Sequence, residues 1–130
     1  MPISTGYQAL LAQANARIKT ISVEQAKGMV HQADVQFVDI RDVRELQRTG
    51  KIAGAFHAPR GMLEFWVDPA SPYHKPLFAQ PLTFVLYCQS GWRSALATDT
   101  LKMMGMDNVC HIEGGFSAWQ QAGGTTEKVD

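Results

Sequence analysis

The chain is poor in cysteine, since its 130 residues include only Cys88 and Cys110. Two cysteines are too few for the disulfide framework that stabilises small secreted domains. A single bridge between Cys88 and Cys110 stays open as an alternative. A reduced intracellular setting is simpler, and we therefore expect a cytoplasmic protein with free thiols.

The sequence also lacks an excess of charge and any long apolar run. Twelve basic and twelve acidic residues cancel, and no run of like charges stands out. This balance argues against the basic field with which proteins attract nucleic acids. No apolar run approaches the length of a membrane span, and residues 1–20 do not resemble a secretion signal. We expect neither a nucleic-acid nor a membrane partner, so any preference for anions must come from a local site.

Length and composition predict one globular domain. Apolar residues make up 45% of the chain and charged residues 18%, and we find neither repeats nor low-complexity segments. A chain of this length can bury one core but is too short for two. The domain is expected to fill residues 1–130, with an N-terminal helix within 1–19, a core at about 20–122 and a polar, frayed tail at 123–130.

Short strand-like segments alternate with helical patterns along the chain. Strands are expected at 20–22, 35–40, 52–59, 82–87 and 108–112. Helices are expected at 7–18, from the Ser22 cap to about 31, at 42–48, from near 92 to 104 and at 114–123, with a short helix and a loop within 60–76. This alternation predicts an α/β fold whose central, mostly parallel five-stranded sheet carries helices on both faces.

Cys88 follows the most apolar of these strands and precedes a short, glycine-containing turn. Ligands of parallel sheets bind at the carboxyl ends of the strands, which is where Cys88 falls. The turn, the start of the next helix and Arg93 would together form a cradle for an anion, and Gly91 supplies the backbone freedom. Such surroundings favour a thiolate, which is the nucleophilic form of cysteine. The alternative is an inert cysteine buried at a strand end.

The segment Cys88-Gln89-Ser90-Gly91-Trp92-Arg93-Ser94 resembles the active-site loop of the rhodanese family of sulfurtransferases. Three further blocks are similar to the family's pattern in the same order. They are FVDIRDVRE at 37–45, GKIAGAFHAP at 50–59, with Lys51 in place of the usual histidine, and IEGGFSAW at 112–119.

This resemblance implies a reaction and a set of partners. Cys88 would take the outer sulfur of a thiosulfate-like donor, hold it as a persulfide and pass it to cyanide, a thiol or a protein acceptor. Arg93 would hold the donor's anionic end or brace the loop. No metal or organic cofactor is implied. The residues expected to bind the substrate are Gln89, Ser90, Gly91, Trp92, Arg93 and Ser94.

Two other functions share this chemistry. A persulfide carrier that receives sulfur from a protein partner would use the same loop without turnover. Cysteine phosphatases and related arsenate reductases place five residues between cysteine and arginine, whereas four separate Cys88 from Arg93. The shorter loop suits one sulfur atom better than a tetrahedral phosphoryl group.

Four further residues are candidates for supporting roles. Asp39 and Arg41 would either lie near the pocket rim and orient the loop or the donor, or form an ion pair that ties the strand end to the next helix. Glu45 is a candidate partner for Arg93 or a solvated helix residue. Arg60 would join Phe65 and Trp66 in a lid that narrows access to the site.

Three features have a structural and a functional interpretation. Residues 60–76, with Phe65 and Trp66, form either a lid or a connection that buries its aromatic rings. Trp92 either forms a wall of the pocket, covers the approach of a protein partner, or packs against the rest of the fold. Cys110 is interpreted as a buried, inert thiol rather than a resolving cysteine, and its neighbour His111 as a residue of the opposite strand face.

Overall fold

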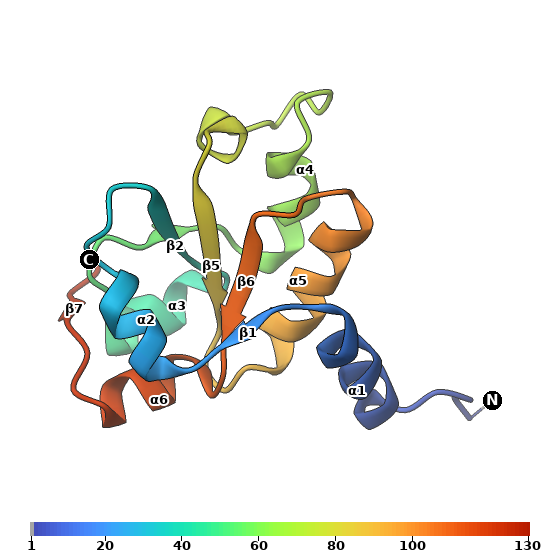
Figure 1. Ribbon diagram of the computed structural model, residues 1–130, viewed down its shortest axis with the longest axis horizontal. Coiled ribbons are helices and arrows are strands. Elements are labelled where there is room, and N and C mark those ends of the chain that lie inside the picture. Colours follow the sequence, from blue (N-terminus) through green and yellow to red (C-terminus); the bar gives the residue numbers. More distant parts are fainter. Residues whose placement is uncertain (1) are drawn as a thin grey trace.

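The computed structural model describes residues 2–130 and has a central sheet between two layers of helices (Figure 1). The strand order is β1-β6-β5-β2-β4 and every neighbouring pair is parallel, which confirms the predicted five-stranded α/β sheet. The strands are β1 (Thr20–Ile21), β2 (Val35–Asp39), β4 (Phe56–His57), β5 (Thr83–Tyr87) and β6 (Val109–Ile112).

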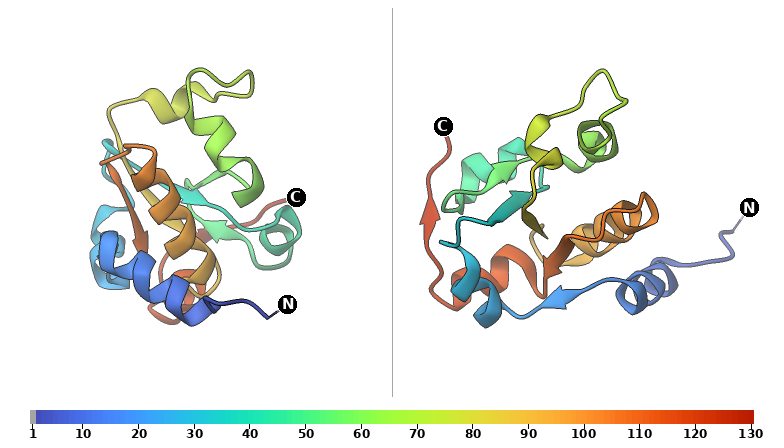
Figure 2. Two further views of the ribbon diagram at one scale, coloured as in Figure 1. Left: turned by 90° about the vertical axis from the view of Figure 1, so that its right-hand side faces the viewer. Right: turned by 45° about the horizontal axis from the view of Figure 1, so that its top comes forward.

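Helices cover both faces of the sheet, and two core clusters lie beneath them (Figures 1 and 2). Alternate residues of β5 point to opposite faces, so Phe84 and Leu86 join one cluster and Val85 and Tyr87 join the other. One layer holds α1 (Tyr7–Arg17), α4 (Leu63–Val67) and α5 (Trp92–Met103), and the other holds α2 (Val23–Met29), α3 (Val43–Thr49) and α6 (Gly115–Gln121). Among residues 2–130, no helix is long and apolar enough to cross a membrane.

Reciprocal capping bonds fix where two of the short helices begin. The Ser22 side chain accepts a bond from the Gln25 N–H, and the Gln25 side chain accepts one from the Ser22 N–H, as predicted. Asp42 and Glu45 form the same arrangement at the start of α3. This second capping box matters for the site because it holds the Glu45 side chain at the start of α3.

The expectation of a frayed tail is wrong for its middle part. Strand β7 (Thr126–Glu127) pairs antiparallel with β3 (Lys51–Ile52). The Glu127 carboxylate accepts a bond from the Gly54 N–H at 2.9 Å and lies 3.3 Å from the Lys51 ammonium. Lys51, which replaces the histidine usual in the resembled family, therefore helps to hold the tail.

The segment that joins β4 to β5 contains two short 3₁₀ helices, η1 (Arg60–Met62) and η2 (Pro76–Ala79), on either side of α4. Trp66 packs edge-on against Phe56, with ring centroids 6.1 Å apart, and belongs to the core on the α5 side of the sheet. Phe65 remains exposed. The connecting interpretation therefore holds for Trp66, while a lid role for Phe65 stays a prediction.

Candidate active site

Cys88 directly follows β5, the central strand, at the carboxyl edge of the sheet. The chain needs only four residues to pass from the end of β5 at Tyr87 to the start of α5 at Trp92. Gly91 makes this possible because it adopts a left-handed conformation with φ of 102°. The cysteine side chain is buried at the base of the resulting loop, and only 1% of the residue is exposed.

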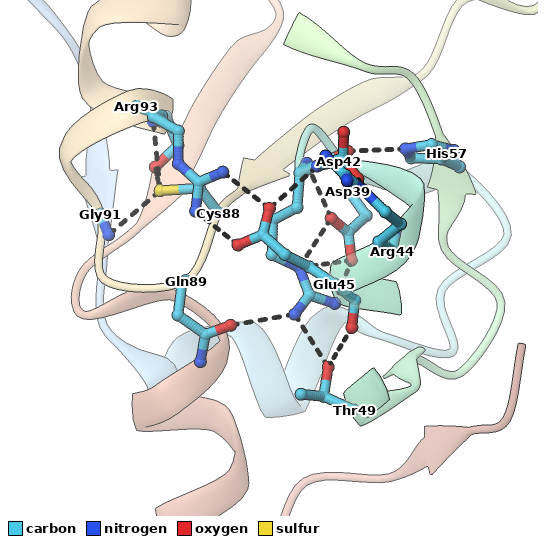
Figure 3. A network of polar contacts seen from close by, with 12 residues as sticks. Asp39, Asp42, Arg44, Glu45, Thr49, His57, Cys88, Gln89, Gly91 and Arg93 are labelled. Carbon is cyan, nitrogen blue, oxygen red and sulfur yellow. Dashed lines mark hydrogen bonds and ion pairs between the residues drawn. The ribbon is translucent and has the colours of Figure 1, made fainter. Parts of the chain in front are cut away.

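Polar groups of the loop converge on the Cys88 sulfur (Figure 3). The Gly91 N–H donates to Sγ at 3.2 Å and the Ser94 N–H at 3.4 Å, and the Ser94 hydroxyl lies 3.6 Å away. Ser94 is in the first turn of α5, where free N–H groups and the helix dipole favour negative charge. The polar groups expected of an anion cradle therefore surround the sulfur, and the binding of an anion there stays a prediction.

The start of α6 holds the loop from behind. The Phe116 N–H donates to the Cys88 carbonyl at 2.8 Å, and the Ser117 N–H donates to the Gln89 carbonyl at 3.0 Å. This close approach requires glycine at 115, because a Cβ there would lie 2.5 Å from the Cys88 carbonyl oxygen and φ is 61°. The Gly-Gly pair at the start of α6 thus allows the loop and the helix to come into contact.

A buried ion pair supports the loop from the α3 side. Arg41 and Asp39 are both fully buried and lie 2.7 Å apart, and the Arg41 guanidinium is stacked over the Phe116 ring. Arg41 also donates to the Gln89 side-chain oxygen at 3.0 Å, while the Gln89 amide nitrogen donates to Ser117 at 2.9 Å. The ion pair therefore ties the strand end to α3, where Arg41 donates to Thr49, and it also contacts the loop through Gln89. A role of the pair in orienting the donor stays a prediction.

The side chain of Gln89 is engaged by protein groups. Both ends of its amide form hydrogen bonds, so the side chain braces the loop, and its expected role in binding substrate stays a prediction. Ser90, by contrast, is exposed at the loop's outer surface.

Arg93 and Glu45 form a second pair at the site, with two hydrogen bonds of 2.9 and 3.0 Å. The Arg93 guanidinium holds the pKa of the Glu45 carboxyl below its usual value, and the bond to Glu45 raises the pKa of Arg93. Both side chains are partly exposed. The pair confirms Glu45 as the partner of Arg93 and makes Arg93 a brace between the loop and α3.

Arg60 lies at the same edge of the sheet, since its N–H donates to the Ile40 carbonyl at 3.1 Å. Its side chain is exposed and makes no hydrogen bond or ion pair with any residue that the structure describes. The structure therefore places Arg60 near the site but not in the loop's network.

A cleft of about 420 Å³ opens beside the loop, between α1, β1 and β6. Trp92 forms one of its walls, is 56% exposed and packs against Tyr7 with ring centroids 5.1 Å apart. The cleft is lined by Asn15, Thr20, Ser90, Gly91, Trp92, His111, Glu113 and Gly114.

His111 is the residue that the sequence interpretation missed. Its Nδ1 lies 2.9 Å from the Ser94 hydroxyl, and its Nε2 lies 3.1 Å from the Thr20 hydroxyl. Burial lowers the pKa of His111 to about 4, so the imidazole is neutral at physiological pH. Only the pairing of β6 with β5 brings His111 to the Cys88 loop, and the local sequence gives no sign of it.

Cys110 points to the other face of the sheet, into the cluster that contains Phe37 and Trp119, whereas Cys88 belongs to the opposite cluster. Both thiols are free, so the alternative of a bridge between them is wrong. Burial raises the pKa of the Cys110 thiol, as expected for an inert cysteine.

The fold and the loop together define a class of protein. Residues 22–122 match the model of the Rhodanese-like domain, and the chain belongs to this family. The thiosulfate sulfurtransferase GlpE of Shewanella oneidensis is 36% identical over 104 residues, which cover 80% of this chain and 94% of that protein. An uncharacterized protein of Synechocystis is 35% identical over 118 residues, which cover 90% of this chain but only 59% of that longer relative.

Two solved structures extend these similarities. A protein of unknown function from Rhodopseudomonas palustris, described as a possible tyrosine phosphatase, is 50% identical, with a TM-score of 0.94 and 98% of each chain covered. The polysulfide-sulfur transferase homodimer of Wolinella succinogenes is 26% identical, with a TM-score of 0.71, covering 95% of this chain and 88% of that one.

Proposed function

We propose that this protein is a sulfurtransferase that carries a sulfane sulfur as a persulfide on Cys88. The observation that carries the proposal is the pair of N–H donors, from Gly91 and Ser94, that point at a buried cysteine sulfur ahead of α5. The similarity to a thiosulfate sulfurtransferase supports the same reaction class.

The proposed reaction has two half-reactions that balance without a cofactor. The Cys88 thiolate attacks the outer sulfur of thiosulfate, and sulfite leaves with the electron pair of the broken S–S bond. Cyanide or a thiolate then attacks the outer sulfur of the persulfide, and the Cys88 thiolate is released again. The chemistry predicts ping-pong kinetics, with sulfite released before the acceptor reacts.

The loop is suited to stabilise the terminal sulfur of such a persulfide. Two of its N–H groups already contact Sγ, and those of Ser90, Trp92 and Arg93 donate to no other residue that the structure describes. Donors fixed around developing negative charge act as an oxyanion hole does. We therefore assign the loop N–H groups, rather than the Gln89 side chain, to the binding of substrate sulfur.

The description of the Rhodopseudomonas relative raises phosphatase activity as a rival. A phosphatase loop must surround a tetrahedral anion and offer it the arginine fork. In this chain the loop has only four residues between Cys88 and Arg93, and both terminal nitrogens of Arg93 bind Glu45. These two features favour sulfur transfer over phosphate transfer. For the same reasons they favour sulfur transfer over arsenate reduction.

The rings of Tyr7 and Trp92 are exposed and pack together beside the loop, and they favour the variant in which the protein is a persulfide carrier. Exposed aromatic side chains are common in protein interfaces. A persulfide carrier that exchanges sulfur with a protein partner would use this surface, and its loop chemistry would be identical.

A thiocyanate assay with thiosulfate and cyanide tests the proposal. The protein should turn over and the Cys88→Ser variant should not, while p-nitrophenyl phosphate should remain uncleaved. A persulfide on Cys88 without turnover would favour the carrier. Phosphate release that depends on Cys88, without thiocyanate formation, would overturn the assignment in favour of the phosphatase.

A further inference from the structure

A continuous chain of polar side chains leads from the buried Cys88 sulfur to the cleft. The sulfur lies 3.6 Å from the Ser94 hydroxyl, which lies 2.9 Å from His111 Nδ1. His111 Nε2 lies 3.1 Å from the Thr20 hydroxyl, and Thr20 is exposed and lines the cleft. Every neighbouring pair in this chain is thus within hydrogen-bonding reach.

The chain can be hydrogen-bonded in either direction, because a hydroxyl and a neutral imidazole each both donate and accept. In one direction the Cys88 thiol donates to Ser94, Ser94 donates to His111 Nδ1, and Nε2 donates to Thr20. In the other, Thr20 donates to Nε2, Nδ1 donates to Ser94, and Ser94 donates to the sulfur. The first direction suits a thiol and the second a thiolate.

We propose that Ser94, His111 and Thr20 form a proton relay, in which the tautomer of His111 sets whether the Ser94 hydroxyl accepts from the Cys88 thiol or stabilises its thiolate. We call these three residues the relay. His111 acts through Ser94 and is therefore a positioning residue, not one that touches the substrate.

The switch from thiol to thiolate conserves every atom. The thiol proton moves to Ser94 Oγ, the Ser94 proton moves to His111 Nδ1, and the Nε2 proton moves to Thr20 Oγ. The original Thr20 hydroxyl proton then leaves to water in the cleft. One proton departs, and the imidazole changes tautomer without gaining charge. A histidine with a lowered pKa suits this role because a lasting imidazolium is never needed.

Neither ring nitrogen of His111 is hydrogen-bonded to a charged side chain among the residues that the structure describes. Among the described residues, the imidazole nitrogens hydrogen-bond only to Ser94 and Thr20. The titratable and charged groups on the elements packed around His111 are, in chain order, Arg17 on α1, Lys19 before β1, Cys88 after β5, Arg93, Asp99 and Lys102 on α5, and Glu113 after β6. Arg17 forms an ion pair with Asp99, and Arg93 forms one with Glu45.

The relay deepens the proposed function, on which its biological meaning rests, but it can be tested without sulfur chemistry. In a Cys110→Ala background, Cys88 is the only thiol, so its rate of alkylation by iodoacetamide reports the thiolate. His111→Gly should slow alkylation at pH 7 by about tenfold, since the Ser94 hydroxyl loses the donor behind it. Circular dichroism shows whether the variant is folded.

Rescue by small molecules separates a relay from simple packing. Imidazole has both nitrogens of the missing ring and should restore most of the lost rate in His111→Gly. Thiazole has a similar size and one acceptor nitrogen but no N–H, so it should restore none. Equal rescue by both molecules, or a rate unchanged by His111→Gly, would overturn the proposal.

Two further variants keep the test decisive if His111→Gly does not fold. His111→Asn can still bond to Ser94 but lacks a second nitrogen that reaches Thr20, and it should also be slowed about tenfold; an unchanged rate would overturn the relay. Thr20→Val should slow alkylation, whereas Thr126→Val, an exposed strand threonine far from the site, should not. Rescue by imidazole alone in a protein that forms neither thiocyanate nor a Cys88 persulfide would leave the relay intact and reject the proposed sulfur chemistry. Thiocyanate formation with equal rescue by both molecules would support the sulfurtransferase and overturn the relay.

Discussion

Arg93 of the active-site loop and Glu45 of α3 form a doubly hydrogen-bonded ion pair, with distances of 2.9 and 3.0 Å. The same carboxylate accepts the Asp42 N–H that closes the capping box of α3. One side chain thus joins the helix start to the loop (Figure 3). In the resting protein Arg93 therefore links the loop to α3, and its positive charge is partly offset by the Glu45 carboxylate.

Glu45→Gln should strengthen the binding of an anionic donor. Glutamine can still close the capping box, but it removes a negative charge and releases the Arg93 guanidinium from its ion pair. We expect KM for thiosulfate to fall by about two- to fivefold, the scale of one partly exposed ion pair. Steady-state kinetics measure this KM. The control is Asp42→Ala, which weakens the cap of α3 but leaves the Glu45 carboxylate in place. A rise in KM would contradict the account.

The same pair predicts a pH dependence of stability. Arg93 lowers the pKa of Glu45 in the folded protein below the value of 4.5 expected when unfolded. The contribution of the ion pair to stability is therefore present above pH 4.5, and it is lost as the pH falls through the pKa that Glu45 has in the folded protein. The free energy of unfolding should favour the wild type over Glu45→Gln at pH 7, by less than about 1 kcal/mol, and this difference should be smaller at pH 3. Urea titrations at both pH values measure the gap, which must not widen in acid.

The buried pair of Asp39 and Arg41 should tolerate the loss of both charges better than the loss of one. Asp39→Asn leaves the Arg41 guanidinium buried without its counter-charge and should cost about 3 to 5 kcal/mol of unfolding free energy. The double variant Asp39→Asn, Arg41→Met should recover part of that loss. It should still lower activity, because Gln89 loses the donor that orients it. Denaturant titrations measure both variants. If the double variant were no more stable than Asp39→Asn, the unpaired Arg41 charge would not be the cause of the loss.

Gly115→Ala should damage the site without touching its chemistry. The new Cβ would lie 2.5 Å from the Cys88 carbonyl oxygen, and the positive φ disfavours alanine. We expect a loss of at least about 2 kcal/mol of unfolding free energy, together with lower thiocyanate formation. Gly61→Ala is the matched control, since its Cβ would meet nothing within 4 Å, and it should leave both measurements unchanged.

Local sequence signals were sufficient for the framework of the fold. The strand before Cys88, the cap at Ser22 and the stop at Gly105 each depend on residues close together in the chain. The short strand β7 was missed because it is defined by pairing with β3, more than seventy residues away. A polar two-residue strand has no hydrophobic alternation that could reveal it.

The site was predictable to a similar extent. Cys88, Gly91, Arg93 and Ser94 lie within the segment 88–94, so their grouping follows from the sequence alone. The part played by His111 depends on the register of β6 against β5, which places it behind Ser94. No spacing rule connects a histidine seventeen residues after the serine to the thiol. Long-range strand pairing is thus what the sequence interpretation lacked in both cases.

Intact mass spectrometry after brief exposure to thiosulfate tests the central claim most directly. The account predicts one added sulfur on the wild type and on Cys110→Ser, its loss on addition of cyanide, and none on Cys88→Ser. An added sulfur that survives in Cys88→Ser, or the absence of any sulfur adduct on the wild type, would contradict the assignment of Cys88 as the sulfur-carrying nucleophile.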